Sequence, residues 1–161
     1  MMCGSCSNEN AIKQVFMWYQ RNKRNGGPIT KEMLLSCMEH KEPGSPKLSV
    51  ISFDGSFHGR TYGLLGLSHS KAIHKVDIPT TDWPTAPFPK LKYPLDQHHG
   101  DNDKEVQRCL SRVRELIKEW SDKGVPVACM IVEPVQAEGG DNYATPKFFQ
   151  ELQQICKQVL C

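Results

Sequence analysis

Two cysteines, a glycine and a serine near the start of the chain have the types and spacing of a ligand-binding turn. Cys3 and Cys6 form a C-x-x-C pair, which can hold one metal centre or form a redox pair. Gly4 and Ser5 lie between them and run directly into a helical pattern. A helix N-terminus opened by glycine is a ready anion site. The residues therefore indicate a phosphate-binding turn with two thiols, and a capped helix with two buried cysteines is the open alternative.

A second group of reactive side chains lies in the stretch D-G-S-F-H-G-R-T, residues 54–61. Phe57 and His58 are flat side chains that could stack on a planar ring. Arg60 offers a planar fork that matches a carboxylate. Taken singly, each residue has an ordinary interpretation: His58 as a loop histidine, and Arg60 as one partner of a surface ion pair. Their clustering beside two glycines favours a site.

Two carboxylates, Glu133 and Glu138, form the third candidate, and two glycines follow them. They come directly after an apolar run, residues 125–132. In open α/β sheets, ligands bind at the carboxyl ends of strands, which is where both this group and residues 54–61 are expected. The alternative is a strand-end turn with solvated carboxylates.

Hydrophobic periodicity predicts the elements that must position these groups. We expect Ser7 or Asn8 to cap the first helix, and Glu9 to suit its positive end. The predicted elements, in chain order, are a helix over 7–24, a short helix over 31–39, a strand over 48–53, a long irregular segment over 78–94, a helix over 105–123, a strand over 125–132 and a last helix opened by Thr145 or Pro146.

Composition bounds the class of protein. With 161 residues, 39% of them apolar and 24% charged, the chain suits one globular domain with a real core. A net charge of +2 is too small to argue for nucleic acid, and no apolar run has the length of a membrane span. We therefore expect neither as a partner. The seven cysteines favour reduced thiols inside a cell. Both ends look cut, so we expect a fragment of a longer protein.

Several motifs carry a resemblance to a known family. S-F-H-G-R-T (56–61) and V-E-P-V-Q-A-E-G-G (132–140) resemble motifs of the class III, pyridoxal-phosphate-dependent aminotransferases. C-G-S-C-S-N-E-N (3–10), and S-K-A-I-H-K (70–75) running into D-W-P (82–84), more specifically resemble the animal members that act on 4-aminobutyrate. Other members have a turn like G-S-E-A-N there. The resemblance implies an α/β fold, in which residues 1–161 are an incomplete part of the large cofactor-binding domain of a fold-type I aminotransferase, with a mostly parallel sheet flanked by helices.

The resemblance also implies a role for each candidate residue. Arg60 would hold the carboxylate of 4-aminobutyrate, and Glu138 would pair with a second arginine that is released to bind 2-oxoglutarate. Cys3 and Cys6 would be ligands of a [2Fe–2S] cluster shared between the subunits of a homodimer. The residues implied to bind pyridoxal phosphate are Gly4, Ser5, Phe57, His58 and Glu133.

The activity implied is the transfer of the amino group of 4-aminobutyrate to 2-oxoglutarate in the mitochondrial matrix, which yields succinate semialdehyde and glutamate. In the family, the lysine that binds the cofactor covalently would lie beyond Cys161, so we expect residues 1–161 alone to be inactive. Two alternatives stay open. The protein could be another ω-amino acid transaminase of the class, or a metal- or phosphate-binding module without catalysis.

Overall fold

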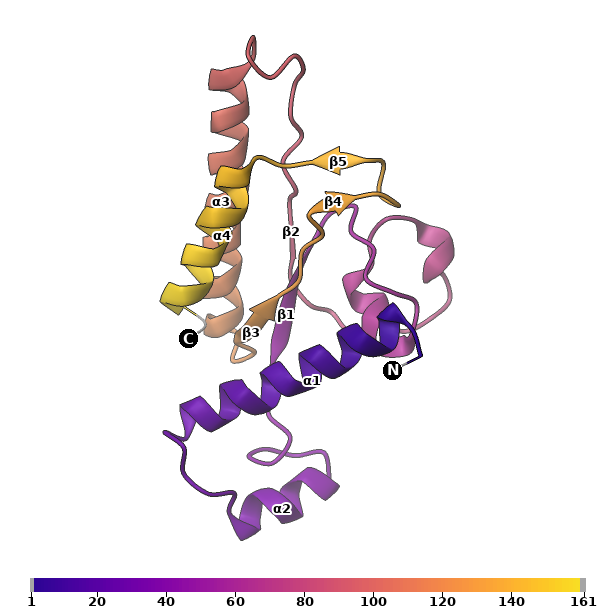
Figure 1. Cartoon of the computed structure of the whole chain (residues 1–161). Coiled ribbons are helices and arrows are strands. Elements are labelled where there is room, and N and C mark those ends of the chain that lie inside the picture. Colours follow the sequence, from indigo (N-terminus) through magenta and orange to yellow (C-terminus); the bar gives the residue numbers. More distant parts are fainter. Residues whose placement is uncertain (1, 160–161) are drawn as a thin grey trace.

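A three-stranded parallel sheet lies at the centre of the structure (Figure 1). The computed structural model describes residues 2–159, with the backbone alone at Val159, so the expected domain end at Cys161 lies outside the described residues. The elements, in chain order, are α1 (Gly4–Lys23), α2 (Lys31–Met38), β1 (Ser49–Phe53), the 3-10 helices η1 (Tyr62–Leu67) and η2 (Ala72–His74), β2 (Thr85–Ala86), α3 (His99–Asp122), β3 (Val127–Met130), β4 (Val135–Gln136), β5 (Asn142–Tyr143) and α4 (Pro146–Val159).

The sheet has the order β2-β1-β3, and both pairings are parallel. Phe53 pairs with Ala86 on one side of β1, and Ser49 pairs with Val127 on the other. All five residues of β1 are buried, as expected for a central parallel strand covered on both faces. The α/β fold with a parallel sheet is therefore confirmed.

Side chains of β1 alternate between two hydrophobic clusters, one on each face of the sheet. Ile51 and Phe53 pack against α3 and α4, which lie side by side on one face (Figure 1). Val50 faces the other way and packs with Ile12 of α1 and with Leu64 of η1. Since successive side chains of a strand point to opposite faces, one short strand connects both halves of the core.

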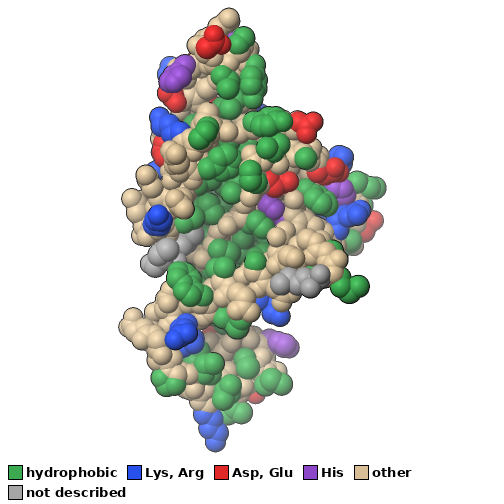
Figure 2. Space-filling view, in the orientation of Figure 1, with side chains coloured by type: hydrophobic (Ala, Val, Ile, Leu, Met, Phe, Trp, Pro, Cys, Tyr) green, Lys and Arg blue, Asp and Glu red, His purple; other side chains and the backbone are tan. Residues whose placement is uncertain are grey.

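Helix α2 extends away from the sheet and keeps several apolar side chains exposed. Figure 2 shows hydrophobic groups at that end of the surface, and Leu34, Leu35 and Met38 are among the exposed ones. Thr30 caps the helix as a threonine should, since its Oγ1 accepts a hydrogen bond from Met33 N at 3.2 Å. Within residues 2–159, no helix combines the length and the apolar character needed to cross a bilayer.

Two predicted helix starts are wrong. Helix α1 begins at Gly4 rather than at residue 7, because Cys3 is the N-cap and its Sγ accepts a hydrogen bond from Cys6 N at 3.5 Å. Ser7 and Asn8 are thus inside the helix and do not cap it. Helix α3 begins at His99 rather than at residue 105, so it is six residues longer at its N-terminal end than the apolar pattern predicts.

Three further features differ from the expected boundaries. The irregular segment 78–94 contains the two-residue strand β2, whose parallel pairing with β1 completes the sheet. Strand β3 covers residues 127–130 and is shorter than the apolar run that predicts it. A small antiparallel hairpin, β4 with β5, follows β3 and was not predicted. The last helix opens at Pro146, as expected.

Candidate functional site

The first turn of α1 presents backbone amides and thiols together. Because the helix begins at Gly4, the N–H groups of its first turn have no intrahelical acceptor by position. Ser5 adds a hydroxyl, and a Cβ placed on Gly4 would meet no atom within 4 Å. The side of Gly4 on which a Cβ would lie is therefore open, and unpaired amides at a helix N-terminus can accept an anion. The corrected helix start moves the anion-binding amides onto Gly4 and Ser5 themselves.

The two thiols of the C-x-x-C pair lie close to each other at the same helix end. Cys3 Sγ and Cys6 Sγ are 3.4 Å apart, and Cys3 is exposed. The hydrogen bond from Cys6 N lowers the pKa of Cys3, whereas the side-chain hydrogen bond with Cys3 raises the pKa of Cys6. Within residues 2–159, no group of three or more His, Cys, Asp or Glu side chains could hold a metal ion. One chain therefore offers two thiol ligands here.

The loop after β1 buries His58 and exposes Arg60. The side chain of His58 is 6% exposed, and in the part of the chain that the structure describes its Nε2 has no hydrogen-bond partner. Burial, together with the nearby His69, lowers the pKa of His58 to about 4, so its ring is neutral at pH 7. Arg60 is exposed, and among residues 2–159 no hydrogen bond or ion pair occupies its guanidinium. A buried neutral ring with one free nitrogen thus lies next to an available cation.

The His58 loop is fixed by contacts from α1 that the sequence did not predict. Asn8 Nδ2 donates to the carbonyl oxygen of His58 at 2.9 Å. Glu9 Oε1 accepts from Thr61 Oγ1 at 2.7 Å and from Gly63 N at 3.0 Å. The expected roles of Asn8 as a cap and Glu9 as a helix-end charge are therefore replaced by contacts with this loop. Sequence separations of 50 or more residues left no local signal for them.

Ser68 holds the same loop from the side of η1. Its hydroxyl donates to the carbonyl oxygen of Gly59 at 2.8 Å and accepts from His58 N at 3.0 Å. Gly59 has a φ of +131°, a conformation that favours glycine, and a side chain there would collide with Ser5 Oγ. This glycine lets the loop approach the first turn of α1 directly.

Glu133 comes to the same place from the end of β3. Its Oε2 accepts a hydrogen bond from Phe57 N at 2.8 Å. Burial raises the pKa of Glu133, and the bond from Phe57 opposes that shift. The structure therefore joins two of the three groups that the sequence singled out, through a contact between residues 76 positions apart.

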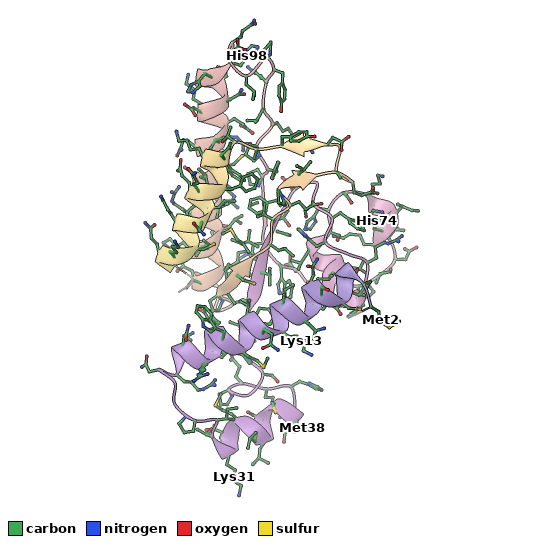
Figure 3. All side chains as sticks on the ribbon, viewed as in Figure 1. Met2, Lys13, Lys31, Met38, His74 and His98 are labelled. Atoms are coloured by element: carbon green, nitrogen blue, oxygen red, sulfur yellow. The ribbon has the colours of Figure 1, made fainter. Side chains whose placement is uncertain are left out.

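Glu138 lies on the exposed side of the site and has a lysine as its partner. Lys71 Nζ is 2.7 Å from Glu138 Oε1, and His74 Nε2 is 3.6 Å from the same oxygen. The bond from Lys71 lowers the pKa of Glu138. The ring of His74 meets that of Phe57 edge-on at 5.1 Å. In Figure 3, His74 and Met2 are both labelled on the right-hand side of the view, the side on which α1 starts.

The hairpin of β4 and β5 closes over the end of β1. Gln136 Nε2 donates to the carbonyl oxygen of Asp54 at 2.8 Å, and Asn142 Nδ2 donates to Gln136 Oε1 at 3.1 Å. Gly139 passes so close to Gly55 that a Cβ would collide with the Gly55 carbonyl oxygen. The glycine after Glu138 thus has a packing role, because it brings the hairpin against the loop that carries the site.

Comparison with known proteins places these features in a family. The whole chain, residues 1–161, matches the family described as Aminotransferase class-III. It is 60% identical over 157 residues to 4-aminobutyrate aminotransferase of Dictyostelium discoideum, covering 98% of this chain and 31% of that protein. It is 53% identical over 161 residues to the mitochondrial 4-aminobutyrate aminotransferase of Mus musculus, covering 100% of this chain and 32% of that protein. The chain thus spans about a third of the length of these curated relatives.

Solved structures show the same architecture. A lysine aminotransferase from M. tuberculosis superimposes with a TM-score of 0.78 at 25% identity, covering 99% of this chain and 32% of that one. An (S)-enantioselective omega-transaminase from Thermomicrobium roseum has a TM-score of 0.70 at 20% identity, covering 99% of this chain and 30% of that one, which shows the fold alone.

Proposed function

The chain belongs to the class III aminotransferases, and we propose that the whole protein transfers the amino group of 4-aminobutyrate to 2-oxoglutarate. The observation that carries this proposal is the pairing of two anion sites around His58. One is the first turn of α1, and the other is the exposed guanidinium of Arg60, which no other group within residues 2–159 occupies. A phosphorylated cofactor and a carboxylate substrate need two such sites. The names of relatives at 50–60% identity support the choice of substrate.

The residues of the first site fit pyridoxal phosphate as the cofactor. Gly4 and Ser5 would hold its phosphate through their amides and the Ser5 hydroxyl, and a Cβ on Gly4 would meet no atom within 4 Å. Phe57 and the neutral, buried ring of His58 would lie against its ring, and Glu133 would lie nearby. When bound, this cofactor acts as an electron sink for the carbon atom that loses a proton. The protein's part is to hold it and to exclude water.

Arg60 would bind the substrate carboxylate through two parallel hydrogen bonds. Glu138, whose charge acts on Arg60, already pairs with Lys71 at 2.7 Å, which reduces its competition with that carboxylate. We propose in addition that Glu138 exchanges Lys71 for a second arginine of the whole protein when 4-aminobutyrate is bound. Release of that arginine would then admit 2-oxoglutarate.

Two finer proposals concern assembly and location. Cys3 and Cys6 would supply two of the four thiolates of a [2Fe–2S] cluster, and a second copy of the chain would supply the other two. A homodimer with its two-fold axis beside α1 would bring the pairs together. Location in the mitochondrial matrix is proposed from relatives named as mitochondrial, such as that of Homo sapiens.

The experiment that tests this function is a transamination assay on the full-length protein. Glutamate formation from 4-aminobutyrate and 2-oxoglutarate, with loss of activity when the cofactor is removed, is the expected result. The alternative, another ω-amino acid transaminase, predicts a better substrate among other ω-amino acids, such as lysine. A protein that binds phosphate but transfers no amino group would contradict the proposal.

A further inference from the structure

Three hydrogen bonds from consecutive residues of α1 hold the Arg60 loop at points on both sides of the arginine. Asn8 binds the carbonyl oxygen of His58, and Glu9 binds Thr61 and the amide of Gly63. Each bond lies between 2.7 and 3.0 Å. The backbone that carries Arg60 is therefore fixed before and after that residue, while its side chain stays exposed.

The carboxylate of Glu9 serves as a hydrogen-bond acceptor for this loop. Within residues 2–159 it forms no ion pair, and one oxygen, Oε1, accepts both bonds. Hydrogen bonds to an ionised acceptor are stronger than neutral ones. The approach is close, because a Cβ on Gly63 would lie 2.6 Å from that oxygen. Asn10, two residues after Asn8, instead binds Cys6 O within the helix at 2.8 Å.

The same helix starts with the anion-binding turn, so it connects the two anion sites. Gly4 and Ser5 lie one turn before Asn8 and Glu9, and Gly59 of the loop contacts Ser5 directly. A rigid helix segment thus sets the position of Arg60 relative to the first turn of α1.

We propose that Asn8 and Glu9 are positioning residues that fix Arg60 at a set distance from the phosphate-binding turn, and so select ω-amino acids by chain length. This inference rests on the proposed function, in which the turn holds the cofactor phosphate and Arg60 binds the substrate carboxylate. We call these three hydrogen bonds the clamp. Because the clamp holds Arg60 at a constant distance from the turn, the length between the amine and the carboxylate of a substrate must match that distance.

The test uses the full-length holoenzyme and three variants. Glu9→Ala removes the two bonds that Glu9 accepts and leaves the bond from Asn8, and Glu9→Gln keeps an acceptor but loses the charge. Asn10→Ala is the matched control, since it removes a bond within the same helix. The probes are 4-aminobutyrate, its homologue with one more methylene, and butylamine, in which a methyl group replaces the carboxylate.

For Glu9→Ala we expect kcat/KM for 4-aminobutyrate to fall about tenfold or more, as the loss of charge-assisted bonds would give. Butylamine, which does not need Arg60, should change less than about twofold, a difference that a general loss of folding would not produce. The preference for 4-aminobutyrate over its longer homologue should shrink. The kcat/KM of Glu9→Gln for 4-aminobutyrate should lie between the values of the wild type and of Glu9→Ala. The value of Asn10→Ala should match the wild type.

Hydrogen exchange of the Gly63 amide gives a readout that is independent of activity. It should accelerate in Glu9→Ala and not in Asn10→Ala. Two results for Glu9→Ala would overturn the positioning role. One is faster exchange with an unchanged ratio of kcat/KM for 4-aminobutyrate to kcat/KM for butylamine, and the other is unchanged exchange of the Gly63 amide. A wild-type protein that does not accept 4-aminobutyrate would instead refute the proposed function, and the exchange of Gly63 would still decide whether the clamp exists.

Discussion

His58 makes the stability of the protein depend on pH, because folding lowers the pKa of this imidazole. The pKa falls from an ordinary 6.5 to about 4, mainly through burial and secondarily through His69. A group whose folded pKa is depressed stabilises the fold above its unfolded pKa, and this stability is lost as pH falls from 6.5 toward 4. At about pH 5 the loss attributable to His58 comes to at most about 2 kcal/mol, before any reduction by solvent screening.

The variant His58→Phe keeps a flat ring in the same space and removes the titration. Urea unfolding of the cofactor-free full-length protein, at about pH 7 and about pH 5, measures the difference in free energy of unfolding. The wild type should lose more stability between these conditions than His58→Phe, by about 1–2 kcal/mol. His69, whose pKa is also lowered to about 4, remains in both proteins and contributes equally. An equal pH dependence in the two proteins would refute the reasoning.

Two further predictions concern Glu133 and the cysteine pair. Because burial raises the pKa of Glu133, its charged form carries a cost that appears as pH rises above the ordinary value, so Glu133→Gln should stabilise the cofactor-free protein near neutral pH and not in acid. Thermal unfolding of the wild type and of Glu133→Gln, near neutral pH and in acid, checks this. A variant that is less stable than the wild type near neutral pH would contradict it. The full-length protein prepared without oxygen should contain about two irons per dimer, and Cys6→Ser should contain none. Iron analysis decides, since equal iron in both proteins, or none in the wild type, would exclude the cluster.

Periodic segments made much of this fold predictable. The apolar run at 48–53 and the amphipathic pattern at 105–123 fix their elements because burial demands a regular spacing of side chains. The start of α1 was missed because Cys3, a less usual cap, takes the position that serine or asparagine would be expected to hold. Strand β2, with two residues, is too short to show any period.

The site was predicted in parts, and its connections were not. Residue types indicated the phosphate turn, the aromatic pair and Arg60, since their chemistry is visible in the sequence. The bonds from Glu9 to Gly63 and from Phe57 to Glu133 join residues 54 and 76 positions apart, and the folded chain alone brings them together. Lys71, the partner of Glu138, was missed for the same reason.

The most direct measurement of the central claim is the Michaelis constant of the full-length Arg60→Lys variant for 4-aminobutyrate. A point charge in place of a bidentate fork should raise that constant about tenfold or more, with cofactor absorbance retained. Arg114→Lys, at an exposed position of α3, is the control and should behave as the wild type. An unchanged Michaelis constant, or loss of the cofactor with unchanged substrate affinity, would show that Arg60 does not bind the substrate carboxylate.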